Sequence, residues 1–145
     1  MIEFRRLKDL REDNDISQND MAKILKVNRS TYSLWELGIN IIPLDYLCSF
    51  ADYFNVSIDY VLGLTNKKVK SINKGFNKKK LGSNMKDIRL KHNLSQENIA
   101  DIIGVSQVAI VKYEKGLVCI STNNLYKFCK EFNISMSDIL GKTKK

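Results

Sequence analysis

The sequence has no long hydrophobic run and very little proline, cysteine or histidine. No apolar stretch approaches the roughly 18 residues of a membrane span, and the charged start MIEFRRLKDL lacks the apolar core of a signal peptide. The three cysteines form no CxxC pair, which is typical of reduced thiols, so we expect a cytoplasmic protein without a membrane partner. One histidine cannot supply a histidine-based metal site, and one proline with seven glycines in 145 residues favours helices over a turn-rich β fold.

Positive charge is unevenly distributed along the chain, whose net charge is +8. Residues 1–66 hold 7 basic and 10 acidic side chains, and residues 81–145 hold 10 basic and 6 acidic ones. Between them, residues 67–80 hold 7 lysines and no acid. A lysine run of this kind is typical of a solvated linker, and it also attracts polyanions.

The chain contains one sequence unit twice. Residues 85–145 align with residues 7–67 without a gap, and roughly a third of the aligned positions are identical. Two copies of this length do not make a solenoid, so each copy should fold as its own domain. We therefore predict domain 1 over residues 1–66, a lysine-rich linker over 67–80 and domain 2 over 81–145.

The hydrophobic spacing in each copy predicts five short helices, which makes the chain all-α. In the first copy, helices are expected from about residue 3 to 13 and after Ser17, Asn28, Pro43 and Ser57. Serine and asparagine are good N-caps, and glycine ends helices in a left-handed conformation. Gly38 and Gly63 are placed to end the third and fifth helices of the first copy. The matching residues of the second copy are Ser95, Ser106, Gly116, Ser135 and Gly141.

Two stretches carry a resemblance to a known family, SQNDMAKILKVNRSTYSLWELG over residues 17–38 and SQENIADIIGVSQVAIVKYEKG over residues 95–116. Both resemble the helix-turn-helix of the Cro and phage-repressor type, also called the XRE family. The tails FADYFNVSIDYVLG and FCKEFNISMSDILG are similar to the fourth and fifth helices of that family. The resemblance implies two five-helix, phage-repressor-like helix-turn-helix domains joined by a basic linker, with motifs at about 18–37 and 96–115.

The resemblance also implies structural roles for several residues. Arg11 with Glu36, and Arg89 with Glu114, match the internal ion pair that joins the first and third helices in the family. Such a pair fixes orientation more than it adds stability. Lys26 departs from the family, which usually has glycine in the turn of the motif, and we expect it to adopt a left-handed conformation at a cost of about 1 kcal/mol.

A helix-turn-helix places its second helix in the major groove of double-stranded DNA, so residues 28–37 and 106–115 are the expected recognition helices. The predicted DNA-binding residues of the first copy are Gln18, Asn28, Arg29, Ser30, Thr31 and Ser33. Those of the second copy are Gln96, Ser106, Gln107, Val108, Ala109, Val111, Lys112 and Lys115. Arginine can read guanine, glutamine can read adenine, and valine or alanine can contact a thymine methyl. Gln18 and Gln96 open their helices beside unpaired amides that favour a phosphate.

Three functions are compatible with these residues. In the first, both domains bind DNA in a sequence-specific transcriptional regulator of the repressor type, whose operator has two unlike half-sites because the two recognition helices differ. In the second, only domain 2 binds DNA, and domain 1 is a dimerisation or partner-binding module, which includes antitoxin and phage-immunity roles. An enzyme is the weakest alternative, because no nucleophile–base pair, metal-ligand spacing or phosphate loop is evident. We expect no cofactor and no small-molecule effector domain, and homodimer formation stays open.

Overall fold

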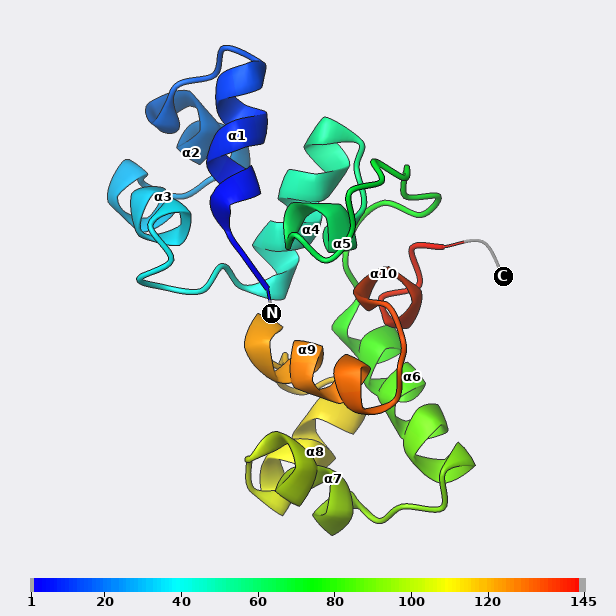
Figure 1. Ribbon diagram of the computed structural model, residues 1–145. Helices are drawn as coiled ribbons and strands as arrows, with labels where there is room; N and C mark the ends of the chain where they lie inside the picture. Colours follow the sequence, from blue (N-terminus) through cyan, green and yellow to red (C-terminus); the bar gives the residue numbers. More distant parts are fainter. Residues whose placement is uncertain (1, 144–145) are drawn as a thin grey trace. The chain divides into compact units, whose positions relative to one another are not determined.

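The computed structural model describes residues 2–143 and is helical, with no strand among those residues. Contacts divide the chain into two compact units, Met1–Gly75 and Phe76–Lys145 (Figure 1). Within the described residues, no helix has both the length and the apolar character needed to cross a membrane. The all-α prediction, with two helix-turn-helix domains, is confirmed.

Unit 1 is a small helical bundle. Its helices are α1 Arg5–Asp13, α2 Gln18–Leu25, α3 Arg29–Glu36, α4 Leu44–Phe54 and α5 Ile58–Val61. Their apolar faces meet in a core that includes the fully buried side chains of Leu7, Met21, Tyr32 and Phe50, which come from four different helices. Each helix is short, so the burial of one apolar face, rather than helix propensity alone, holds it in place.

Unit 2 repeats this arrangement. Its helices are α6 Lys78–Lys91, α7 Gln96–Ile103, α8 Gln107–Glu114, α9 Thr122–Glu131 and α10 Met136–Ile139. The core again draws one fully buried side chain from each of the first four helices, namely Met85, Ile99, Ile110 and Phe128.

The helix-terminal residues take the conformations that the sequence predicts. Ser17 accepts a hydrogen bond from the backbone N–H of Asp20, and Ser106 accepts one from that of Ala109. At the end of α2, Lys26 adopts the left-handed conformation with φ of 62°, and Gly104 does the same at the end of α7 with φ of 76°. Both turns are therefore built alike, and only the lysine bears the steric penalty of a side chain.

The first helix of unit 2 begins earlier than the sequence predicts. The lysine pattern places residues 78–80 in the linker, whereas the structure places them in the first turn of α6, where Asn77 caps the helix. The same segment packs tightly at Gly82, which lies so close to the end of α8 that an added Cβ would sit 2.0 Å from the carbonyl oxygen of Tyr113. The aligned residue of unit 1 is Phe4, and α1 begins only after it, at Arg5.

The expected linker contacts unit 1 near both of its ends. Just before it, the guanidinium of Arg6 donates to the carbonyl of Thr65 and, at 2.6 Å, to the side-chain oxygen of Asn66. At its start, Lys68 Nζ lies 5.6 Å from the centre of the Tyr60 ring. Further along, the backbone N–H of Gly75 donates to Asp52 Oδ2 of α4 at 2.7 Å. The free length between this bond and the start of α6 is therefore much shorter than the extended 14-residue linker that the sequence suggests.

Candidate nucleic-acid interface

Helices α2 and α3 form one helix-turn-helix motif, and α7 and α8 form the other (Figure 1). Ala22 and Ala100 are almost completely buried, and their small side chains leave room for the neighbouring helix. The two turns are closed by equivalent hydrogen bonds, from Val27 N to Ala22 O at 2.9 Å and from Val105 N to Ala100 O at 3.0 Å. The same local chemistry therefore sets the geometry of both motifs.

The outward face of α3 is polar. Arg29 and Ser30 are exposed, whereas Thr31 and Ser33 are half-buried. Asn28 is exposed at the N-cap, where its side-chain oxygen accepts a hydrogen bond from Thr31 N at 2.7 Å. Because this oxygen caps the helix, Asn28 has its amide N–H groups left to donate to a ligand.

The outward face of α8 combines exposed apolar and polar side chains. Gln107, Lys112 and Lys115 are exposed, and Val108 is 62% exposed. Three further predicted residues complete this surface: Ser106, which caps the helix, and the half-buried Ala109 and Val111. Ile110 is fully buried and the Glu114 side chain nearly so, whereas Gln107, Val108 and Lys112 remain accessible.

Gln18 and Gln96 are engaged in internal contacts that the sequence does not reveal. The side-chain amide of Gln18 donates to Glu36 Oε1 at 3.0 Å, and that of Gln96 donates to Glu114 Oε1 at 3.2 Å. Each glutamine thus ties the start of its helix to the end of the recognition helix. Contact with a phosphate at these positions would come from the backbone amides of the helix end.

The predicted ion pairs between the first and third helices are confirmed in both units. Arg11 Nε lies 2.6 Å from Glu36 Oε2, and Arg89 Nε lies 2.7 Å from Glu114 Oε2. Each guanidinium makes a second bond to the same carboxylate, which gives the bidentate geometry that fixes orientation most firmly. The third nitrogen of each arginine bonds the carbonyl that precedes the next helix, in Ile16 and Leu94.

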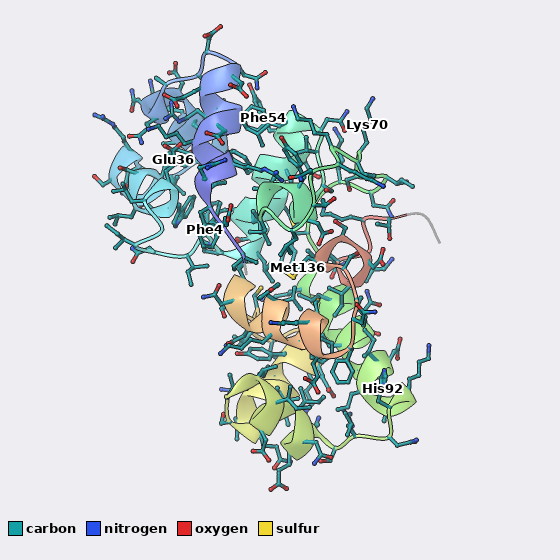
Figure 2. All side chains as sticks on the ribbon, viewed as in Figure 1. Phe4, Glu36, Phe54, Lys70, His92 and Met136 are labelled. Atoms are coloured by element: carbon teal, nitrogen blue, oxygen red, sulfur yellow. The ribbon has the colours of Figure 1, made fainter. Side chains whose placement is uncertain are left out.

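The ion pair of unit 1 has an additional neighbour. The buried hydroxyl of Tyr32 lies beside it and makes no hydrogen bond of good geometry within residues 2–143; Ile110 occupies the aligned position in unit 2. Burial would raise the pKa of the Glu36 carboxyl, but its interactions with Arg11, Tyr32 and Gln18 outweigh that effect and lower the pKa. Glu36 lies in the region between α1 and α3 (Figure 2) and stays ionised at neutral pH.

The turns that follow the two recognition helices differ in character. In unit 1 the turn exposes Leu37 and Ile39, each 67% exposed, and Ile41, 37% exposed. In unit 2 the residue aligned with Leu37 is Lys115, although Leu117 is also exposed. Val118 of unit 2 is exposed as well, at 46%, so the turn is apolar in unit 1 and combines Lys115 with apolar side chains in unit 2.

Two features escaped the sequence-based prediction of the interface. The first is the set of lysines in the first turn of α6, whose signal was the N-cap residue Asn77 followed by Leu81 and Met85 at helical spacing. The second is the participation of Gln18 and Gln96 in the ion-pair clusters, for which the sequence offers no local signal. Within residues 2–143 there is no group of three or more acidic, histidine or cysteine side chains that could hold a metal ion.

Comparison with known proteins places both motifs in one family. The sequence profile described as "Helix-turn-helix" matches residues 7–61 and again residues 85–139. The antitoxin PezA of Streptococcus pneumoniae is 38% identical over 64 residues, which make up 44% of this chain and 40% of that protein. The uncharacterised HTH-type transcriptional regulator YobD of Bacillus subtilis is 34% identical over 62 residues, 43% of this chain and 55% of that protein.

The matched region thus spans about half the length of these relatives or less. Among solved structures, the restriction-modification controller protein C.AhdI of Aeromonas hydrophila is similar over 42% of this chain and 92% of its own, with 24% identity and a TM-score of 0.40. Because the family profile covers most of the chain in two separate matches, the chain belongs to the helix-turn-helix family of the Cro and phage-repressor (XRE) type, as a tandem member with two copies of the domain.

Proposed function

We propose that this protein is a sequence-specific, double-stranded DNA-binding transcriptional regulator of the repressor type. In this proposal α3 and α8 each enter a major groove, and the two units of one chain bind two unlike half-sites. Family membership and the regulators among the similar proteins support the DNA-binding role. The difference between the exposed faces of the two recognition helices supports the unlike half-sites.

The observation that carries the proposal is the composition of the exposed face of α8. Val108 is 62% exposed, which is unfavourable in water because it leaves a large apolar side chain solvated. Against a base pair the same side chain can contact a thymine methyl, while the neighbouring Gln107 can bond adenine and Lys112 can bond guanine. These side chains are therefore better suited to contact base edges in a major groove than to remain exposed to water.

A second candidate function assigns DNA binding to unit 2 and protein binding to unit 1. It is favoured by the exposed apolar residues Leu37, Ile39 and Ile41, which follow α3 where a DNA-binding unit would benefit from basic residues. It is also favoured by the excess of acidic over basic side chains in residues 1–66. In this alternative the sequence preference of the whole chain would come from α8 alone.

The test is selection of duplexes from a random library by the whole chain, followed by affinity measurements on the selected duplex. We expect Lys112→Ala and Arg29→Ala each to raise the Kd for the selected duplex by about 5- to 150-fold, as loss of a base contact would. Lys130→Ala is the matched control, because Lys130 is an exposed lysine in the last turn of α9 and the charge change is the same. It should leave the Kd within about threefold of the parent value.

The outcomes separate the candidates. An effect of Lys112→Ala without any effect of Arg29→Ala would replace the first candidate by the second. A library that yields no preferred duplex would refute sequence-specific binding by either unit.

A further inference from the structure

The unexpected start of α6 brings Lys79 to the end of the recognition helix of unit 2, with Lys78 and Lys80 in the same helical turn; Lys80 Cε lies 3.5 Å from the Cβ position of Gly141, after α10. An ideal Cβ on Gly116 would lie 2.7 Å from the Cα of Lys79, so the first turn of α6 packs directly against the turn that follows α8. That turn is closed by a hydrogen bond from Leu117 N to Lys112 O at 2.9 Å. Lys79 therefore lies beside the turn that follows Lys112 of α8 and its C-cap residue Lys115.

No acidic side chain of residues 2–143 pairs with these lysines. Lys78, Lys79 and Lys80 are all exposed, and none of them is in an ion pair among the residues that the structure describes. The nearby carboxylate of Glu114 is buried and already bonded to Arg89. The positive charge at this end of unit 2 is thus left for a ligand to neutralise.

The position of the lysines is unfavourable for the stability of the helix. The N-terminus of a helix carries a partial positive charge, and a basic residue in the first turn costs a few tenths of a kcal/mol or more. Asn77 accepts hydrogen bonds from the N–H groups of Lys79 and Lys80, which orders this turn in spite of that repulsion. An anion beside the turn would reduce the repulsion among the lysines and the repulsion between the lysines and the partial positive charge of the helix N-terminus.

Part of this basic surface has an apolar counterpart in unit 1. The residues aligned with Lys80, Lys112 and Lys115 are Ile2, Leu34 and Leu37, so three lysine positions of unit 2 are apolar in unit 1. The basic end of the recognition helix is therefore a property of unit 2 and not of the shared fold.

We propose that Lys78, Lys79 and Lys80, here called the α6 lysine surface, bind the DNA phosphate backbone beside the groove that α8 occupies. The inference rests on the proposed function, and it assigns to unit 2 the larger share of sequence-independent affinity. Each phosphate that a lysine neutralises releases a condensed counterion, so the contribution of this surface depends on salt concentration.

The experiment measures association with a random-sequence duplex of about 24 base pairs as a function of salt. The variant replaces Lys78, Lys79 and Lys80 by glutamine, which retains helix propensity and removes three charges. The matched control replaces Lys67, Lys70 and Lys74 by glutamine; these lysines are exposed, precede α6 and give the same change of net charge. Lys70 lies on the outside of unit 1 (Figure 2).

We expect the α6 variant to reduce the slope of log K against log salt by about 2–3, and the control to reduce it by less than about 1. We also expect the helical circular dichroism of the α6 variant to equal that of the parent, with a thermal midpoint at least as high, since the unfavourable charges are gone. Equal slope changes in the two variants, or none in the α6 variant, would refute the α6 lysine surface while leaving the proposed function intact. Failure of the parent protein to bind any duplex would instead refute the proposed function itself.

Discussion

Replacement of Gly82 by alanine should destabilise unit 2 and leave unit 1 unchanged. In most helices this substitution stabilises by about 0.5–1 kcal/mol, because alanine has the higher helix propensity. Here the added Cβ would sit 2.0 Å from Tyr113 O and 2.9 Å from Glu114 O, and both oxygens belong to the backbone of α8. A backbone carbonyl cannot rotate away as a flexible side chain can, so α6 must move or its first turn must unwind.

The magnitude follows from these two responses. Ordinary contacts of a Cβ lie at 3.4–4 Å, so α6 would have to move by more than about 1 Å, and overpacking of this kind costs about 1–3 kcal/mol. Unwinding of the first turn would instead expose Leu81, which is 3% exposed, at a cost of about 1.5–3 kcal/mol. After subtraction of the helix-propensity gain, we expect a net loss of about 1–2 kcal/mol, or about 5–15 °C in the melting temperature of a domain of this size.

The assay uses the fact that Trp35 is the only tryptophan of the chain and is buried in unit 1. Its fluorescence reports the unfolding of unit 1, whereas far-ultraviolet circular dichroism reports both units. In Gly82→Ala the circular dichroism should show an earlier transition, while the midpoint from Trp35 fluorescence stays within about 1 °C of the parent. Ser83→Ala, at the next and exposed position of α6, is the control and should change neither midpoint by more than about 3 °C.

A rise in the circular dichroism midpoint of Gly82→Ala would refute the reasoning, because it would show that this glycine behaves as an ordinary helical one. An equal fall in the Trp35 midpoint would refute the independence of the two units.

Three further predictions concern residues that position the interface. Glu36→Gln leaves the Arg11 guanidinium buried without its carboxylate, so urea unfolding followed by Trp35 fluorescence should show a loss of about 3–5 kcal/mol; a loss below 1 kcal/mol would contradict this. The pKa of Glu36 is lowered in the folded state, so its ionised carboxylate stabilises unit 1 fully at a pH above the pKa of the unfolded chain, near 4.3. This stabilisation is lost as the pH falls through the pKa of the folded state. Glu36→Gln should therefore make the free energy of unfolding depend less on pH in acid. Lys26→Gly replaces a lysine in the left-handed conformation and should raise the melting midpoint reported by Trp35 by a few degrees. The reverse change in unit 2, Gly104→Lys, should lower the stability of that unit by about 1 kcal/mol. Opposite signs would show that the left-handed turn conformation does not cause these stability changes.

The sequence predicts best those features that depend on neighbouring residues. The helix starts at Ser17, Asn28, Ser95 and Ser106 follow from side chains that bond an amide three residues away, and all four caps are present. The exposed faces of α3 and α8 follow from the helical period once those starts are known. The assignment of individual side chains in these faces to DNA contacts remains a prediction.

The sequence predicts poorly what depends on distant contacts. The close packing of α6 on α8 at Gly82 involves carbonyl groups about 30 residues later, and no local pattern encodes that approach. The course of the lysine-rich segment is set by the bond between Gly75 and Asp52, which lie 23 residues apart. Gln18 was assigned to a phosphate from its place at a helix end, but its amide is held by Glu36 across the motif.

The contrast between Phe4 and Gly82 also bears on how the chain avoids misfolding. Adjacent copies of one fold risk exchanging equivalent helices during folding, which is a characteristic failure of repeat proteins. Here α1 could not replace α6, because a phenylalanine would meet the same carbonyl groups that already exclude an alanine Cβ at Gly82. In the reverse exchange, α6 would bring a glycine in place of the Phe4 ring, which lies 4.0 Å from the Cβ position of Gly38, and would leave that contact empty. The difference between Phe4 and Gly82 therefore favours packing of each first helix in its own unit.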